Sequence, residues 1–252
     1  MSKMIASELL KYKRSFAGKL ALIAPMFFGV YGLVLHLYLP EQASLSWDLL
    51  LSMVFNWWPV LFVPLGIALL CTLAENREKR AGNYRSIYSN NISLSKLWFS
   101  KIVAVGLYML LSSVVLMIVV LALGYWKAEG ALPLLSIVEA SLLIWLLACS
   151  LIPLHLFLAA RFGVFAGLIS GVAAMLLGVL SAPESYWLFV PWSWATRLMA
   201  PVIGVHPNGV TLSPGDPLLD ASVIPIGIGA SLLFLVLSAL ITGFWFARRE
   251  VR

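Results

Sequence analysis

The chain has 252 residues, of which 62% are hydrophobic and 11% charged, with a mean hydropathy of +0.97 and a formal net charge of +6. Soluble domains typically carry about 25% charged residues, so this composition excludes a soluble globular protein and indicates an integral membrane protein. The basic residues flank apolar runs and do not gather on one polar unit, which favours anionic lipid headgroups over nucleic acid as a partner.

Residues 1–18 form the first predicted element. Apolar side chains such as Ile5 and Leu9 alternate there with basic ones such as Lys11 and Arg14. This pattern predicts an amphipathic helix along the cytoplasmic interface, either a plain lipid anchor or a functional element. No Ala-x-Ala-like cleavage site follows, which favours a retained first span over a signal peptide.

Six apolar runs meet the requirement of about 20 residues for a spanning helix. They cover residues 19–39, 49–74, 98–124, 134–159, 163–181 and 223–246. If each run crosses once, fifteen of the 17 Lys and Arg residues fall on one side. Because cytoplasmic segments retain Lys and Arg, we expect both termini in the cytoplasm and one membrane domain that comprises residues 1–252.

The connection between the second and third runs is rich in charge from Glu75 to Arg85. Such a segment is either a solvated loop or a short docking helix, because Tyr84, Ile87 and Tyr88 at helical spacing would give a helix one apolar edge. Ser93 is placed to cap the third span.

Polar groups in the fourth run allow two interpretations. Glu139 lies about 10 Å into this span if the helix starts near Leu132. It either lines a route from the outer leaflet and pairs with Arg197, or lies among lipid headgroups. His155 follows Pro153, and we expect it to satisfy a carbonyl that the proline leaves free. Residues 160–162 form the predicted connection to the fifth run.

The outer segment of residues 182–222 is interrupted by prolines and is rich in Trp and Tyr. Aromatic residues of this kind favour the membrane interface, so we predict short helices that lie in, or dip into, the outer leaflet. An exposed loop is predicted from residue 201 to residue 217.

The chain has no P-loop, so any ATP-driven work needs another subunit. Candidates for an intramembrane enzyme are Ser170, His155 and the Glu75/Glu78 pair, none of which has the spacing of a known catalytic motif. The two cysteines lack metal-ligand spacing. These features favour a non-catalytic chain without a metal or cofactor of its own.

Several short stretches resemble six-helix ABC exporter permeases, and among these the lantibiotic-immunity permeases of the MutG and MutE kind. The segments 78–85, 92–96 and 100–101 resemble the coupling region of these permeases. Further similarity lies in residues 8–16, in Ile152-Pro153-Leu154-His155-Leu156 and in Pro191-Trp192-Ser193-Trp194. The order of these pieces agrees with the topology that the charges predict.

The resemblance implies an all-α fold with six transmembrane helices, an N-terminal amphipathic helix, a cytoplasmic coupling helix and short re-entrant helices before the last span. It also implies a complex in the bacterial cell membrane that contains two permeases, the same or different, and two ATPase subunits that bind ATP and Mg. Such transporters expel lantibiotic-type peptides. The residues expected to couple to the ATPase are Glu75, Glu78, Gly82, Tyr84 and Arg85, with Gly82 allowing the short helix to end sharply.

The substrate path is expected at the outer end of the spans. Acidic Glu139 and Glu184 would attract the Lys groups of a cationic peptide, and Arg197 is a further candidate. Tryptophans either bind the apolar face of the peptide or form a structural belt: Trp187, Trp192 and Trp194. The alternatives are a general drug or lipid exporter permease and, without an ATPase, an intramembrane enzyme or a passive immunity protein.

Overall fold

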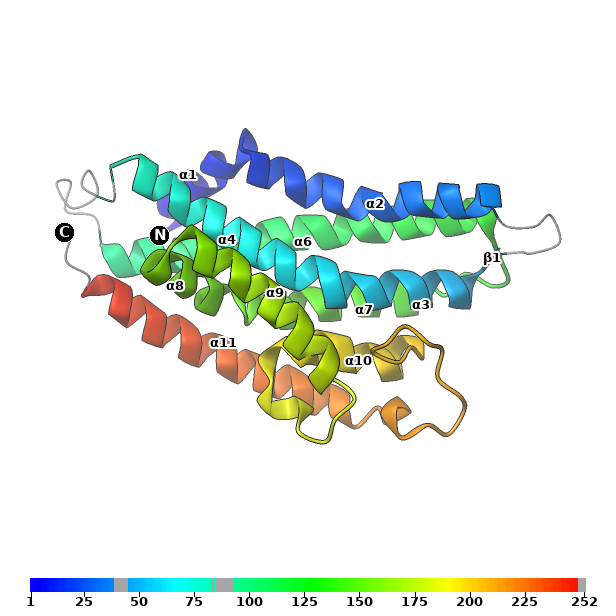
Figure 1. The fold of residues 1–252 in the computed structure, drawn as a ribbon. Coiled ribbons are helices and arrows are strands. Elements are labelled where there is room, and N and C mark those ends of the chain that lie inside the picture. Colours follow the sequence, from blue (N-terminus) through cyan, green and yellow to red (C-terminus); the bar gives the residue numbers. More distant parts are fainter. Residues whose placement is uncertain (39–44, 83, 85–92, 249–252) are drawn as a thin grey trace.

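The computed structural model describes residues 1–38, 45–82, 84 and 93–248. It is a bundle of long helices that run side by side (Figure 1). Six helical stretches are long and apolar enough to cross a membrane, which confirms the predicted all-α fold with six spans. These stretches are Phe16–Val34, Trp47–Arg80, Leu94–Lys127, Leu134–Phe162, Val164–Ser181 and Val223–Ala247.

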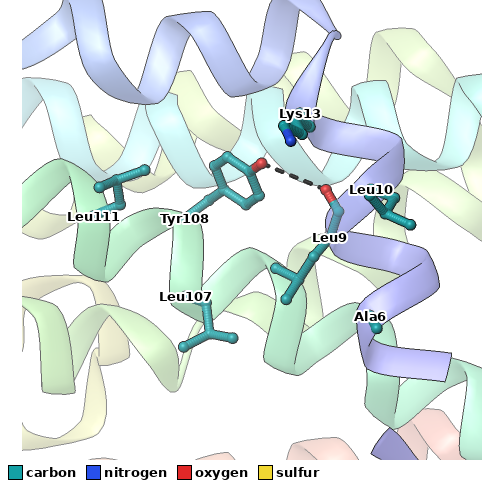
Figure 2. Close-up of a pocket in the computed structure, with 7 residues that line it drawn as sticks. All are labelled: Ala6, Leu9, Leu10, Lys13, Leu107, Tyr108 and Leu111. Carbon is teal, nitrogen blue, oxygen red and sulfur yellow. Dashed lines mark hydrogen bonds between the residues drawn. The ribbon is translucent and has the colours of Figure 1, made fainter. Parts of the chain in front are cut away.

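Helix α1 (Ser2–Lys13) runs across the direction of the bundle and packs against α6 (Figure 2). A tight turn follows, in which the Ser15 hydroxyl accepts a hydrogen bond from the Gly18 amide at 3.1 Å. A Cβ at Gly18 would lie 2.2 Å from the Tyr12 carbonyl oxygen, so only glycine fits this turn. The chain then enters the first span, α2 (Phe16–Tyr38). An amphipathic helix lying across the spans fits an interfacial position.

The second span consists of α3 (Trp47–Trp57), a π-helical turn η1 (Trp58–Phe62) and α4 (Val63–Arg80). The third is α6 (Leu94–Lys127), and the predicted Ser93 cap is present, with its hydroxyl accepting from the Lys96 amide at 3.5 Å. Both spans extend beyond the apolar runs 49–74 and 98–124. Three of the charged residues that extend the second span, Glu75, Arg77 and Glu78, find partners within the bundle.

The fourth span is divided into α7 (Leu134–Cys149) and α8 (Ile152–Phe162), and the fifth is α9 (Val164–Ser181). The prediction that residues 160–162 form the connection is wrong, because they belong to α8. Gly163 alone separates α8 from α9, with a φ of 92° that favours glycine.

Short helices precede the last span, as predicted. They are η2 (Trp187–Phe189), η3 (Pro191–Ser193) and α10 (Trp194–Ile203), followed by η4 (Pro217–Leu219) and the last span, α11 (Val223–Ala247). We call residues 182–203 the re-entrant segment, because α10 packs among α3, α7 and α11. The predicted loop 201–217 starts too early, since α10 continues through Pro201 to Ile203. Two short parallel strands pair at the end of the bundle where α3 begins and α6 ends. They are β1 (Leu45–Ser46) and β2 (Ala128–Glu129).

Alternating spans bring α1 and the end of α11 to the same end of the bundle (Figure 1). We call this the α1 end. The starts of α6 and α9 and the ends of α4 and α8 lie there too. Exposed basic side chains mark it: Lys3, Lys13, Arg80, Lys96, Arg161 and Arg248. The sides of the bundle are apolar and exposed, with Leu233 at 62% and Ile241 at 68%, as expected of a surface that faces lipid.

Candidate functional site

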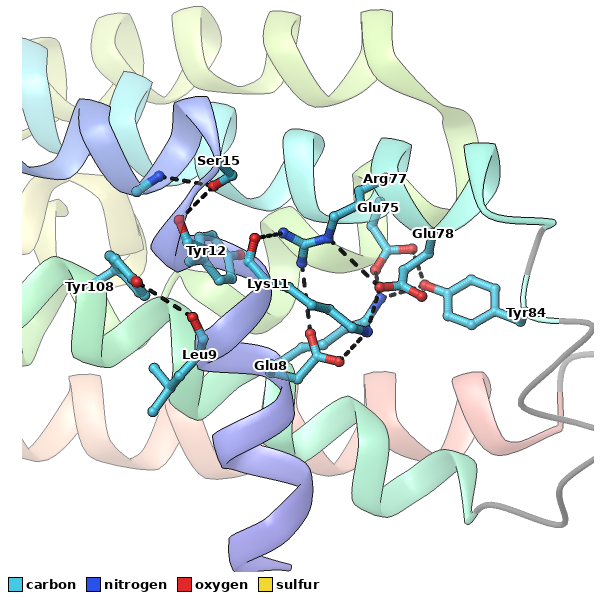
Figure 3. Close-up of polar contacts among 12 residues, drawn as sticks. Glu8, Leu9, Lys11, Tyr12, Ser15, Glu75, Arg77, Glu78, Tyr84 and Tyr108 are labelled. Carbon is cyan, nitrogen blue, oxygen red and sulfur yellow. Dashed lines mark hydrogen bonds and ion pairs between the residues drawn. The ribbon is translucent and has the colours of Figure 1, made fainter.

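A cluster of charged side chains joins α1 to the last turn of α4 (Figure 3). The Lys11 ammonium donates hydrogen bonds to Glu8 at 2.6 Å and to Glu78 at 2.7 Å. Arg77 adds a second cation, and its Nη1 donates to the Lys11 carbonyl oxygen at 3.1 Å. Its other nitrogens lie 3.8 Å from Glu8 and 3.9 Å from Glu78, longer than a hydrogen bond. Two cations therefore share two carboxylates that come from different helices.

A second group lies deeper and joins α4 to α6. Glu75 accepts from the Lys101 ammonium at 2.6 Å and from the Tyr84 hydroxyl at 2.7 Å. Lys101 also donates to the Tyr84 hydroxyl. Both Glu75 and Lys101 are only 1% exposed. We call the two groups together the charge cluster: Glu8, Lys11, Glu75, Arg77, Glu78, Tyr84 and Lys101.

The charge cluster has strong electrostatic consequences. Burial by itself would lower the pKa of Lys11, but the hydrogen bonds to Glu78 and Glu8 outweigh it and raise the pKa above the usual lysine value. For a fully buried pair such as Glu75 and Lys101, removal of one partner leaves an uncompensated charge, which costs about 3–5 kcal/mol. The cluster therefore fixes α1, α4 and α6 relative to one another as long as every partner is present.

The structure brings together three of the five residues predicted to couple to an ATPase, Glu75, Glu78 and Tyr84. Glu75 and Glu78 belong to α4 itself and not to a separate short helix. Gly82 follows the end of α4 with a φ of 97°. Arg85, and with it most of the predicted coupling helix, lies outside the described residues.

Sequence reasoning missed the partners of these acids. The sequence places Glu8 and Lys11 in a predicted amphipathic helix and in the similar stretch 8–16, and Lys101 in the similar segment 100–101, but it pairs none of them with Glu75 or Glu78. A signal for Lys101 was available, because an ionisable residue inside an apolar run needs a partner. The structure supplies that partner as Glu75, one helix away.

The predicted tryptophan candidates lie in the re-entrant segment and are used for packing. Trp194 is 3% exposed, and its Nε1 donates to the Leu188 carbonyl oxygen at 3.0 Å. Trp187 is also buried, and the Arg197 guanidinium lies 5.7 Å from the centre of its ring. These two rings offer little surface to a peptide. Their position fits the structural alternative better than the binding one.

The charged candidates at this end are separate from one another. Glu139 and Glu184 are exposed. Arg197 is buried and donates to the Leu218 carbonyl oxygen at 2.8 Å, and the acids whose charges act on it are Asp220 and Asp216. Of the two alternatives for Glu139, the structure therefore gives no support to the pairing with Arg197.

His155 lies in a chain of hydrogen bonds between α8, α9 and the re-entrant segment. Its Nε2 accepts from Trp192 Nε1 at 3.3 Å, so Nδ1 carries the proton and donates to the Ser170 hydroxyl at 3.0 Å. Ser170 in turn donates to the Gly167 carbonyl oxygen at 2.7 Å. The expectation that His155 satisfies a carbonyl freed by Pro153 is therefore wrong. The nitrogen that faces Ser170 therefore carries a proton and cannot accept one from the Ser170 hydroxyl. This argues against a Ser/His catalytic pair.

A comparison with protein families matches residues 4–179 to the family described as "ABC-2 family transporter protein". The match covers more than two thirds of the chain, from α1 to α9, and includes all seven residues of the charge cluster. No curated protein and no solved structure gives a significant match.

Proposed function

This chain belongs to the ABC-2 family of transporter proteins, and from that premise we propose that it serves an exporter that expels lantibiotic-type or other antimicrobial peptides. Members of the family are multi-pass membrane permeases that work with separate ATPase subunits.

We propose that the ATPase dimer, which would bind ATP and Mg, docks at the α1 end on the segment that starts at Glu75. The observation that carries this proposal is the burial of Glu75 and Glu78, which bind Lys101 of α6 and Lys11 of α1. A push on the end of α4 would therefore move α1 and α6 with it. Lys11 and Arg77 share Glu8 and Glu78, so their ion pairs can exchange while α1 shifts. Docking on this side agrees with the expectation from the charges that both termini lie in the cytoplasm.

On the substrate side, we propose that a cationic peptide leaves the membrane between this permease and a second one, identical or different. Exposed Glu139 and Glu184 would attract its Lys groups. An amphipathic peptide already lies in the interface, so a route open to the outer leaflet needs no passage through the whole bilayer.

The first experiment is co-expression of the chain with candidate ATPase subunits and a second permease, followed by purification in mild detergent. The proposal expects an ATPase to co-purify and a lantibiotic to stimulate ATP hydrolysis. Stimulation by other compounds alone would keep the transporter and discard the peptide. If no ATPase binds, the docking assignment fails.

Glu78→Gln tests coupling within that complex. It keeps the shape of the side chain and removes the charge that ties Lys11 of α1 to α4, while Glu8 of α1 itself still binds Lys11. ATP hydrolysis should therefore continue while resistance to the peptide falls. Glu78→Lys is less informative, because a third cation beside Lys11 and Arg77 would also destabilise α1. Glu129→Gln, an exposed acid on β2 at the opposite end, is the matched control.

A further inference from the structure

A groove of about 530 Å³ runs between α1 and α6 on the side of the bundle (Figure 2). Its walls are almost entirely apolar, and two of its lining residues bring polar groups, a lysine and a tyrosine. The residues that line it are Ala6, Leu9, Leu10, Leu107 and Leu111, with Lys13 and Tyr108 as the polar ones. Leu107 and Leu111 are 41% and 40% exposed, so the groove opens away from the bundle core.

The two lysines near the end of α1 have different surroundings. Lys11 points into the charge cluster and binds two carboxylates. Lys13, two residues later, is exposed, and among the described residues no carboxylate pairs with it. The Tyr108 hydroxyl is only weakly engaged, at 3.5 Å from the Leu9 carbonyl oxygen. The groove therefore has a cation and a hydroxyl donor that are available to a ligand.

The depth of the groove fits an acyl chain. Leu107 lies 13 residues after the start of α6, which corresponds to about 20 Å along the helix. Because α6 is about 51 Å long and the hydrocarbon core about 30 Å thick, the helix exceeds the core by about 20 Å. With this excess on the side of the interfacial α1, the boundary of the hydrocarbon falls near Leu107 and Tyr108, and Leu111 lies one turn deeper.

We propose that this groove binds an anionic glycerophospholipid of the leaflet in which α1 lies. Its phosphate is held by Lys13 and the Tyr108 hydroxyl, and one acyl chain lies along Leu107 and Leu111. The groove matches this ligand in both charge and polarity, with a cation at the level of the headgroup and leucines at the level of the chain. This site requires only the membrane-spanning fold and does not depend on the proposed ATPase docking.

The test compares phosphatidylglycerol with phosphatidylcholine on the purified full chain by native mass spectrometry at equal lipid concentrations. The proposal expects preferential retention of phosphatidylglycerol. Lys13→Gln should lower that retention about fivefold, the effect of one basic residue near a charged surface, and leave phosphatidylcholine unchanged. Ala6→Trp, at an exposed position of the groove wall, should fill the groove and reduce both lipids.

Lys3→Gln is the matched control, an exposed lysine of the same helix outside the groove. If it lowers retention as much as Lys13→Gln, a diffuse positive field and not a site attracts the lipid, and the proposal is overturned. Equal retention of the two lipids, or full retention in Ala6→Trp, would overturn it as well. Unchanged melting temperatures of all three variants ensure that each loss reports on binding.

Discussion

The two ends of the bundle are held together by different chemistry. At the α1 end, ion pairs between buried charges link α1, α4 and α6. At the other end, the re-entrant segment is held by neutral groups, such as the Ser193 hydroxyl on the Trp187 carbonyl oxygen at 2.8 Å and Trp194 on Leu188. Its cation, Arg197, donates to a backbone carbonyl and lies over the Trp187 ring, and although the charges of Asp220 and Asp216 act on it, no ion pair with them is found among the described residues.

This difference bears on how each end responds to change. Each buried charge depends on one or two specific partners, and its loss leaves the remaining charge without compensation. Neutral aromatic contacts are numerous and individually weak, so the loss of one is tolerated. The α1 end is therefore suited to a sensitive link between helices, and the re-entrant segment to a robust structural role.

The largest effect is expected for Lys101→Met, which leaves Glu75 buried without its cation. We expect a loss of about 3–5 kcal/mol in the free energy of unfolding, measured by thermal or denaturant unfolding in detergent. Adding Glu75→Gln should restore most of this loss, because the uncompensated charge disappears. Lys96→Met, at an exposed position of the same helix, serves as the control. If Lys96→Met lost as much stability as Lys101→Met, the loss could not be assigned to the buried Glu75–Lys101 pair.

The next effect concerns the close approach of the re-entrant segment to α9. A Cβ at Gly178 would lie 2.7 Å from the Trp192 carbonyl oxygen, which is backbone and cannot move aside cheaply. Gly178→Ala should destabilise the fold by about 1–3 kcal/mol. Gly229 in α11 has nothing within 4 Å of such a Cβ, so Gly229→Ala should be neutral or slightly stabilising. The same sign for both variants would contradict the packing argument.

A smaller loss of stability is expected at alkaline pH, and it comes from the ion pairs of the α1 end. The pKa of Lys11 is raised in the folded state, so its ion pairs stabilise the fold fully below the ordinary lysine pKa of 10.5 and are lost as pH rises through the raised value. We expect a loss of about 1–2 kcal/mol, since the Lys11 side chain is partly exposed. The measurement is the unfolding midpoint against pH in the alkaline range. Lys11→Met should lack this loss, and a parallel decline in both proteins would assign it to other groups.

The smallest effect is expected for Trp192→Phe in the re-entrant segment. It removes one long hydrogen bond to His155, so a loss of about 0.5–1 kcal/mol is expected in the free energy of unfolding. Trp194→Phe, which removes the bond to Leu188, offers a comparison within the same segment. A loss as large as that of Lys101→Met would remove the contrast between the two ends.

The spans were predictable because length and apolar composition dominate the choice of a membrane helix. Their ends were not, since Glu75 to Arg80 look like a solvated loop until their partners are known. Of the charge cluster, only the α4 acids and Tyr84 were predictable from the sequence, and the cations that pair with these acids were not. The acids stood out by charge density, but Lys11 lies 67 residues from Glu78 in the chain, and nothing local indicates that pairing. For the same reason, the sequence did not identify the partners of His155 and Arg197.

The π-helical turn at Trp58–Phe62 separates two parts of one span that have different neighbours. Before it, α3 faces α6 and α10, and after it, α4 faces α8 and α9. A π-turn accommodates one extra residue and rotates everything beyond it by about 100° relative to an uninterrupted helix. In evolutionary terms, the turn allows each half of the span to adapt to its own surroundings. Substitutions that refit α4 to α8 and α9 need not be matched by changes in α3.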